Sequence, residues 1–442
     1  MCYAIPGKVI DIKDKIATVE YFGEQKKAIN EIDDLKIGDY VYAQGGYIIK
    51  NIPQDEALSI LSTWKETFFE LQELDLRLSR LDLEKTGIDK RLANTLDRVL
   101  EGEILKRDNL LYLLNLEKDK ELALLFKTAN FLRQKNLGNS CCVHGIIEFS
   151  NYCSQRCAYC GISSHNRKLQ RYRMTKDEIV NAAGVAIETH GFKALVLQSG
   201  EDPYYSIDDL CGIIKEIKSR FAVLIFVSFG EVGLDGLKKL YDAGARGLLM
   251  RFETSNTKLY EKLHSCHSGE SQNLKSIDTR IAHLKEAYRL GYLIITGGLI
   301  GLPGQTDEDI LNDIFLAKEL NTEMYSFGPF LPHPATPLKD EKAPDIKKVL
   351  KALAVCRLVG GRDAKILVTT GFETLHKKAR EEGLLAGANS VMLNVTPEEF
   401  AKDYTIYPNR AHAGESIQNQ IDETLMILRG LGRAPTDLGI GG

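Results

Sequence analysis

The chain divides into three stretches that differ in how apolar and polar positions alternate. Residues 1–54 contain short runs of alternating or β-branched residues, such as KVIDI and IATVEYF, with Gly23 and Gly38 between them. Alternation with a period of two is typical of half-buried strands, and glycines mark the turns that join them. We therefore expect a small antiparallel, OB-like β-barrel over residues 1–54, ending at Pro53.

Residues 55–93 follow a helical pattern instead. Leucine and aromatic residues recur every three or four positions from Leu58 to Leu81, among charged residues. This spacing marks the apolar face of amphipathic helices. The stretch is predicted to be a helical connector that packs on its neighbours, with a dedicated surface for a partner as the alternative.

The third stretch alternates strand-like and helical segments. Apolar, strand-like segments begin near residues 146, 192, 222, 245, 292, 323, 365 and 389, and helical segments separate most of them. Repeated strand–helix units favour a parallel sheet, and eight such units favour an α/β barrel of the (βα)8 TIM type over an open doubly wound sheet. Residues 94–442 are assigned to this barrel together with its N-terminal helical extension.

Polar residues gather where these strands end. The C-terminal strand ends of such barrels form the mouth of the active site, so these residues are expected to converge on one site. They are Cys153, Ser199-Gly200-Glu201, Glu231, Arg251, Glu253, Gly304-Gln305, Thr369-Thr370 and Asn394.

Composition narrows the class of protein further. Lys and Arg total 57 against 61 Asp and Glu, a net charge of −4, which argues against nucleic-acid binding by bulk charge. No apolar run approaches the length of a membrane-spanning helix, and the N-terminus lacks the features of a secretory signal. We expect a cytoplasmic protein that binds neither nucleic acid nor membrane.

Three of the nine cysteines crowd into one short segment, Cys153-x3-Cys157-x2-Cys160. This crowding is typical of a metal centre rather than of a disulfide scaffold. Three thiolates can ligate three irons of a cubane cluster and leave the fourth iron open to a substrate or cofactor. A zinc site with His165 as fourth ligand is the competing interpretation, because structural zinc usually has four protein ligands.

This spacing, with Tyr159 before the last cysteine, resembles the radical S-adenosylmethionine (SAM) superfamily. The segments IIEFSNYCSQRCAYCGI, RYRMT, LQSGEDPY, RFETSN, GLIGLPGQT and GPFLPHPATPL are similar to the HydE family of [FeFe]-hydrogenase maturation. Biotin synthase and methylornithine synthase are more distant relatives. The resemblance implies a [4Fe-4S] cluster, bound SAM and an external low-potential electron donor, which together produce a 5′-deoxyadenosyl radical.

The resemblance also implies roles for individual residues, each with a packing or ion-pair role as the alternative. Cys153, Cys157 and Cys160 would hold the cluster, and Arg280 would pair with the carboxylate of SAM, a pairing suited to two parallel hydrogen bonds. The other cofactor-binding positions are Tyr159, Ser199, Gly200, Glu201, Glu231 and Glu253. The substrate cavity would be lined by Arg251, Thr369, Thr370, Met392 and Tyr407.

The remaining cysteines carry weaker signals. The HydE family often has further C-terminal cysteines for an accessory cluster, but GFETLHKKAREEG contains none, which also weakens a biotin synthase assignment. Cys356 and Cys211 lie in helical segments and are expected to be structural. The segment with His264, Cys266 and His267 is expected to be an exposed loop rather than a metal site. Cys141 and Cys142 receive no role.

The N-terminus MCYAIPGKV resembles the opening of the HypC/HupF hydrogenase assembly chaperones, and GDYVYAQGGYIIKNI is similar to their second strand-rich element. In that family the second residue, here Cys2, can bind iron once the initiator methionine is removed. The family usually has a histidine where this chain has Gln44, and an amide is a poorer iron ligand than imidazole. Cys2 is therefore assigned to iron binding or to docking of a partner.

The two resemblances together favour a radical SAM enzyme that acts on an iron-bound precursor of a hydrogenase cofactor. A HypD-like assembly factor or a hydrogenase large subunit is the expected partner of the N-terminal module. A helical tether would keep the cargo of that module near the barrel mouth. The alternatives are a radical SAM enzyme with a small organic or amino-acid substrate, and a metallochaperone scaffold without turnover.

Overall fold

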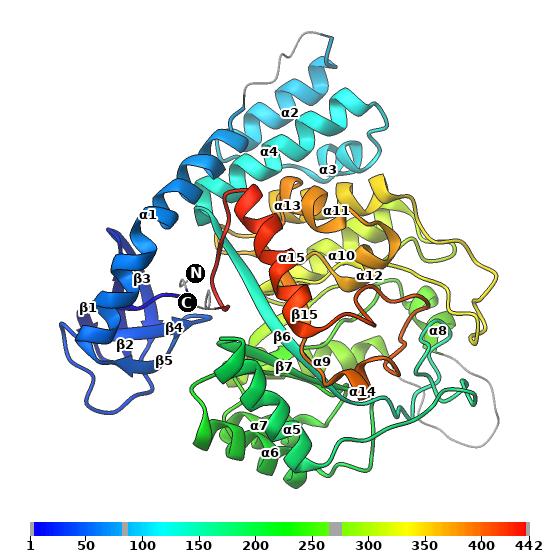
Figure 1. The fold of residues 1–442 in the computed structure, drawn as a ribbon. Helices are drawn as coiled ribbons and strands as arrows, with labels where there is room; N and C mark the ends of the chain where they lie inside the picture. Colours follow the sequence, from blue (N-terminus) through cyan, green and yellow to red (C-terminus); the bar gives the residue numbers. More distant parts are fainter. Residues whose placement is uncertain (1–3, 82–86, 265–275, 439–442) are drawn as a thin grey trace.

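The computed structural model describes residues 4–81, 87–264 and 276–438. It consists of a small N-terminal β-barrel, a long helix that leaves it, a group of helices and a large α/β barrel (Figure 1). Cys2, Cys266 and His267 lie outside the described residues. Within the described ranges, no helix has both the length and the apolar character needed to cross a membrane.

The N-terminal module is a closed barrel of five strands in the order β1-β2-β3-β5-β4. The strands are β1 (Gly7–Lys13), β2 (Ile16–Tyr21), β3 (Glu24–Ile29), β4 (Tyr40–Gln44) and β5 (Tyr47–Ile52). The predicted antiparallel barrel is confirmed with one exception, because β3 and β5 pair in parallel. Five strands that close into a ring cannot alternate in direction all the way round, so one neighbouring pair has to be parallel.

Four helices connect the two barrels: α1 (Gln54–Leu78), α2 (Lys90–Leu100), α3 (Arg107–Leu114) and α4 (Asp119–Leu137). The apolar stripe of the sequence predicts α1 correctly. This helix is fastened to its surroundings, because the buried Asp75 carboxylate lies 2.7 Å from Arg133 Nη2 and 3.1 Å from Arg433 Nε. The connector is therefore a packed element of the fold.

The large barrel has eight parallel strands, and the predicted (βα)8 fold is confirmed. They are β6 (Ser140–Ser150), β7 (Ala194–Ser199), β8 (Leu224–Ser228), β9 (Gly247–Leu249), β10 (Leu293–Thr296), β12 (Met324–Tyr325), β14 (Lys365–Ile366) and β15 (Ser390–Asn394). Each pairs with the next, β15 pairs with β6, and a parallel bridge between Leu367 and Ser390 closes the ring between β14 and β15. The strands lie where the sequence predicts them.

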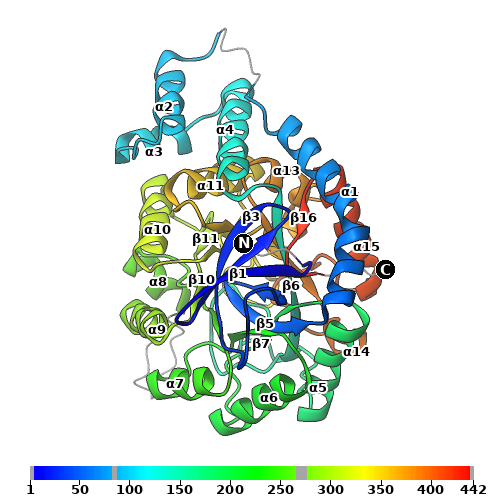
Figure 2. The ribbon, with the colours of Figure 1, turned by 90° about the vertical axis from the view of Figure 1, so that its left-hand side faces the viewer.

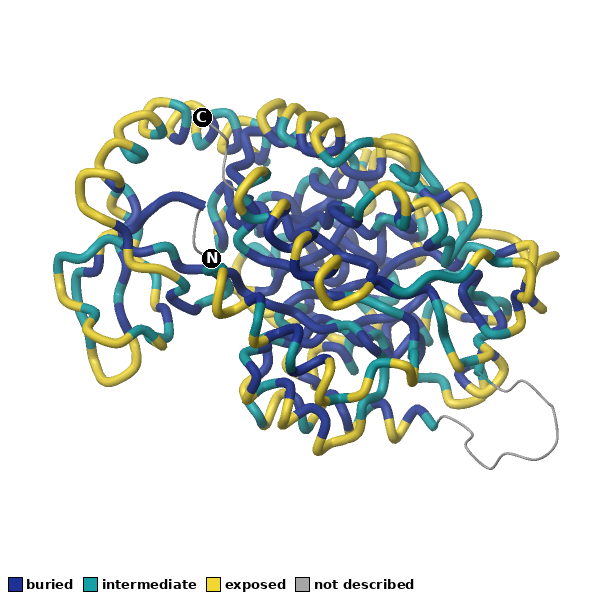
Figure 3. The backbone as a smooth tube through the Cα atoms, turned by 60° about the horizontal axis from the view of Figure 1, so that its bottom comes forward, coloured by how far each residue is buried: buried dark blue, intermediate teal, exposed yellow. Residues whose placement is uncertain are grey.

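Helices cover the outside of this barrel, and the buried backbone follows its strands (Figure 3). The helices are α5 (Lys176–Gly184) with a π-helical turn (Val185–Thr189), α6 (Ile207–Arg220), α7 (Leu234–Asp242), α8 (Thr257–His264), α9 (Ile277–Leu290), α10 (Asp307–Glu319), α11 (Ile346–Val359), α12 (Thr370–Leu375), α13 (Ala379–Leu385), α14 (Glu398–Ala401) and α15 (Ile417–Gly430). Three short strands complete the fold: β11 (Leu299–Ile300), β13 (Gly328–Pro329) and β16 (Ala434–Pro435), of which β16 extends the pairing of β6.

The N-terminal module covers one end of the large barrel (Figure 2). Tyr47 Oη donates a hydrogen bond of 3.2 Å to Gly291 O, just before β10, and Arg246 Nε, just before β9, lies 3.0 Å from Glu31 Oε1. These contacts are at the N-terminal ends of the strands, whereas the predicted active site is at their C-terminal ends. The expectation that the module holds its cargo near the barrel mouth is therefore wrong for this arrangement.

The turn between β4 and β5 brings the module into contact with the barrel, which allows a direct test. Gly45 has φ +54°, and a Cβ added there would lie 2.7 Å from Leu224 Cδ2 and 2.9 Å from Leu293 Cδ1. We expect Gly45→Ala to lower the free energy of unfolding by about 1–3 kcal/mol more than Gly46→Ala, because only Gly45 adds a steric clash to the backbone strain. Gly46, with φ +82°, has no atom within 4 Å of an added Cβ. Denaturant unfolding of both variants measures the difference, and equal losses would contradict the docking contact.

Candidate active site

The cysteine-rich loop follows β6 and is held by backbone hydrogen bonds from three directions. Ser154 N donates to Glu201 O at 2.9 Å, beyond the end of β7, and Ala158 N donates to Leu263 O of α8 at 2.8 Å. Gly161 N donates to Ile406 O at 2.7 Å. All three cysteines of the loop are of intermediate exposure. The loop therefore presents three thiols from a backbone whose path is fixed.

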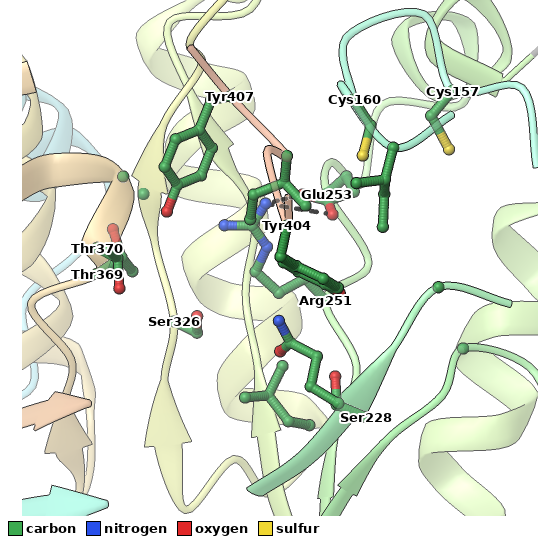
Figure 4. A pocket seen from close by; sticks show the side chains of 18 of the residues that line it. Cys157, Cys160, Ser228, Arg251, Glu253, Ser326, Thr369, Thr370, Tyr404 and Tyr407 are labelled. Carbon is green, nitrogen blue, oxygen red and sulfur yellow. Dashed lines mark hydrogen bonds and ion pairs between the residues drawn. The ribbon is translucent and has the colours of Figure 1, made fainter. Parts of the chain in front are cut away.

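These thiols border a cavity of about 290 Å³ at the C-terminal ends of the strands. Figure 4 shows Cys157 and Cys160 on one side of it and Thr369 and Thr370 on the other, with Arg251 between them. All but one of the site residues predicted within the described ranges line this cavity: Cys153, Cys157, Tyr159, Cys160, Ser199, Gly200, Glu201, Arg251, Glu253, Arg280, Thr369, Thr370, Met392 and Tyr407. The convergence expected from the strand ends is therefore observed for most of them, but Gly304, Gln305 and Asn394 do not border this cavity.

Glu231 is the predicted cofactor-binding residue that does not line this cavity. Its Oε1 accepts a hydrogen bond of 3.0 Å from Arg280 Nε, while Arg280 Nη1 donates to Arg251 O at 2.9 Å. Burial would lower the pKa of Arg280. Neighbouring phenolic and acidic groups, Glu231 among them, outweigh this effect and raise the pKa of the guanidinium. Glu231 thus orients a charged Arg280 at the cavity wall.

Glu253 has a strained backbone, with φ +68° in the left-handed region that side chains other than glycine rarely adopt. Such strain costs roughly 1–3 kcal/mol and is concentrated at functional sites. Its carboxylate lies 3.0 Å from Arg251 Nη2. Burial would lower the pKa of Arg251, but the charge of Glu253 reverses the effect and raises it. The pair places one fixed positive and one fixed negative charge in the wall of the cavity.

The donor atoms suit an iron–sulfur cluster. Burial, with a smaller contribution from Cys153, raises the pKa of the Cys160 thiol to about 12. Thiolates are the metal ligands, so binding of iron has to displace these protons. His165, the fourth ligand of the zinc interpretation, is exposed and does not line the cavity. Three thiols on one loop beside an open cavity fit a cluster with one iron left for another ligand.

Gly200 is packed directly against the cysteine loop. A Cβ there would lie 2.1 Å from Tyr152 O and 2.7 Å from Cys153 Cβ. We expect Gly200→Ala to displace Cys153 and to lower the iron content of anaerobically reconstituted protein at least several-fold. Gly212→Ala is the control, because its added methyl group meets no atom within 4 Å. Full iron binding by Gly200→Ala would contradict the close approach of these two segments.

Sequence reasoning missed the ion pair at the base of the cavity. Glu148 of β6 and Arg410 both line it, and their side chains form two parallel hydrogen bonds of 2.6 Å. Gln198 and Asn394 also donate to the Glu148 carboxylate, at 3.4 and 3.2 Å. Burial would lower the pKa of Arg410, but the charge of Glu148 outweighs this effect, so the pKa of Arg410 is raised. No single motif signals this pair, because its partners are 262 residues apart.

Two of the remaining cysteines, Cys356 and Cys211, are structural. Cys356 of α11 has no exposed surface and Cys211 of α6 is 8% exposed, so both predictions of core positions are confirmed. Cys141 and Cys142 are buried neighbours in β6, and successive strand residues point to opposite faces. Cys141 packs in the large core outside the strands, whereas Cys142 packs with residues inside the barrel floor.

Comparison with known proteins agrees with the geometry of the site. Residues 147–317 match the Radical SAM superfamily, and residues 1–64 match the HupF/HypC family. The chain is 40% identical over 311 residues to the [FeFe] hydrogenase maturase subunit HydE of Thermotoga maritima, covering 70% of this chain and 86% of that protein. The chain belongs to the radical SAM superfamily. It is a HydE-like radical SAM enzyme, with the [4Fe-4S] cluster and SAM as its cofactors, and carries an N-terminal HupF/HypC-like domain.

Other radical SAM proteins share the same barrel. The enzyme is 29% identical to 3-methylornithine synthase of Methanosarcina acetivorans, over 79% of this chain and 96% of that one. The crystal structure of methylornithine synthase (PylB) superimposes with a TM-score of 0.66 at 26% identity, over 77% of this chain and 97% of that chain. The structure of HydG, at 20% identity and a TM-score of 0.66, shares the fold over 84% of this chain.

Proposed function

We propose that the two ends of the cavity have different tasks. Cys153, Cys157 and Cys160 hold the cluster, and SAM binds beside them through Ser199, Glu253 and Arg280, with Tyr159, Gly200 and Glu201 completing that wall. The substrate binds against the opposite wall, formed by Arg251, Thr369, Thr370, Met392 and Tyr407. What supports this division is that all these residues border one cavity of about 290 Å³.

When bound and reduced, the cluster and SAM supply a 5′-deoxyadenosyl radical. The chain's own residues orient the reactants and exclude water. Glu231 and the Arg251 carbonyl fix the guanidinium plane of Arg280, whose remaining N–H groups would hold the carboxylate of SAM. The Glu148–Arg410 pair closes the base of the cavity without an uncompensated charge. A polar and preorganised wall holds the reactants in position around a reactive intermediate.

We further propose that the enzyme acts in maturation of the metal cofactor of [FeFe] hydrogenase, on an iron-bound precursor. The observation that carries this proposal is the 40% identity to the HydE maturase over 86% of its length. The HupF/HypC match of residues 1–64 adds a second, independent link to hydrogenase assembly. The N-terminal module is the proposed docking site for a HypD-like factor or a hydrogenase large subunit.

In vitro maturation tests this function. We expect the reconstituted enzyme to restore hydrogenase activity to an anaerobic maturation mixture that lacks HydE, and to release 5′-deoxyadenosine when a low-potential donor reduces it. SAM cleavage without restored hydrogenase activity would overturn the maturase assignment but keep the radical enzyme. Transfer of deuterium from a labelled amino acid into 5′-deoxyadenosine would instead indicate a methylornithine synthase type of substrate.

A further inference from the structure

A second group of metal-ligating side chains lies at the opposite end of the large barrel from the cysteine loop. Cys142 and His144 are two residues apart on β6, so both side chains point inward, toward the barrel floor. Asp437 follows β16, which pairs with the start of β6. The three residues are only 2–3% exposed. The group unites a strand of the barrel with the C-terminal segment.

The ligand atoms of this group lie close enough together to approach one metal ion. The thiol, imidazole and carboxylate ligand atoms all lie within 4.8 Å of one another. His144 Nε2 is 3.4 Å from Asp437 Oδ2. Metal–ligand bonds of about 2.0–2.3 Å in a tetrahedron place neighbouring ligand atoms roughly 3.3–3.6 Å apart. The group therefore needs little movement to surround one ion.

The structure also provides space for an ion. A cavity of about 10 Å³ is bordered by all three side chains, by Thr436 and by Gly45 of the N-terminal module. This volume corresponds to about one water-sized sphere. Nε2 is the ring nitrogen of His144 that approaches Asp437, so it is the nitrogen placed to bind an ion here.

Neighbouring groups hold the three side chains in place. Thr436 Oγ1 donates to Asp437 Oδ2 at 2.7 Å, and Val143 N donates to the same oxygen at 3.3 Å. The His144 ring stacks on Phe226 with 4.9 Å between the ring centroids. Support of this kind orients the ligands of metal sites in proteins.

The charges around this small cavity favour a dication. The other charged groups that border it, Lys365 and Glu323, pair with each other. A thiolate on Cys142 and the carboxylate of Asp437 would together supply two negative charges. These balance one divalent cation, and the imidazole completes a mixed sulfur, nitrogen and oxygen ligand set. Such a set suits Zn²⁺ and Fe²⁺ rather than Mg²⁺ or Ca²⁺.

We propose that Cys142, His144 and Asp437 bind a single divalent transition-metal ion, Zn²⁺ or Fe²⁺, in the cavity beneath Gly45. The site is separate from the cysteine loop and does not depend on the proposed function of the enzyme. Because the module contributes the wall at Gly45, the ion lies where the two barrels meet. A water or a group from the module can occupy its fourth position.

Metal analysis of the full chain carrying its iron–sulfur cluster tests the proposal. After exposure to Zn²⁺ and removal of loosely bound metal, we expect about one zinc per chain. X-ray absorption at the zinc edge should show one sulfur ligand and otherwise nitrogen or oxygen. Zinc with three sulfur ligands would place the ion in the cysteine loop, and absence of retained zinc together with absence of extra iron would also overturn the proposal.

Two variants test the location of the site, and a second metal tests the identity of the ion. His144→Gln should lose the ion, whereas Cys141→Ser should keep it, because Cys141 is an equally buried neighbour outside the group. Equal retention by wild type and His144→Gln would contradict the site. If His144→Gln fails to fold, the sulfur count in the wild type decides. Mössbauer spectra of protein given ⁵⁷Fe²⁺ distinguish the metals, since a mononuclear high-spin ferrous signal beside the cluster identifies iron as the occupant.

Discussion

Replacing Cys153 and Cys157 together by alanine is expected to abolish reductive cleavage of SAM. Two missing thiolates leave a cubane cluster with one protein ligand, which cannot retain it. Iron content should fall from about four per chain to near zero, and formation of 5′-deoxyadenosine should fall below detection. Iron analysis and chromatography of anaerobically reconstituted, reduced protein measure both quantities.

Cys211→Ala provides the matched control. It removes a thiol of the same chemistry from α6, where the side chain packs in the core away from the cavity. Its iron content and SAM cleavage should equal those of the wild type. Retention of the cluster by the double cysteine variant would contradict the assignment of this loop as the cluster site.

Glu148→Gln is expected to lower the free energy of unfolding by about 3–5 kcal/mol, the typical cost of breaking a buried ion pair. The substitution leaves Arg410 charged and buried, with its main counter-ion removed. Anaerobic denaturant unfolding, followed by circular dichroism, measures the loss. Replacing both partners, as in Glu148→Gln with Arg410→Met, should recover much of the stability because it leaves no unpaired buried charge.

An exposed ion pair of equal length serves as the control for this prediction. Arg98 Nε lies 2.6 Å from Glu103 Oε2, but the two side chains are 37% and 49% exposed. Glu103→Gln should cost less than about 1 kcal/mol, because solvent screens the charges and solvates whichever one remains. Equal effects of Glu148→Gln and Glu103→Gln would show that burial does not govern the strength of the Glu148–Arg410 pair.

The sequence predicts the barrels well because their signals are local. Runs such as FKALVLQSG, followed by a helical stretch of amphipathic spacing, determine strand and crossover without knowledge of distant residues. Several site residues are predictable for a related reason, since they follow strands whose ends face the barrel mouth. Cys153, Ser199 and Thr369 are found by this rule, and all three border the cavity. Arg280 of α9 and Tyr407 are indicated only by the family resemblance.

The features that the sequence does not predict depend on contacts between segments far apart in the chain. Glu148 lies within the apolar strand IIEFS, and only the structure brings Arg410 against it. In the same way, a polar residue after β8 is expected to line the cavity, but Glu231 does not border it and instead pairs with Arg280. The position of the N-terminal module is a third case, because the hydrophobic periodicity of a sequence does not indicate which end of a barrel a separate domain covers.

The burial of Asp75 in α1 limits how the protein can be dissected. A shortened chain that begins at residue 94 would contain the whole catalytic barrel but would lack this carboxylate. Arg133 and Arg433, each no more than 1% exposed, would then be two enclosed cations without their shared anion. Such a fragment is expected to be poorly soluble or unstable even if its catalytic residues are intact, so its inactivity would say nothing about the need for the N-terminal module in the reaction.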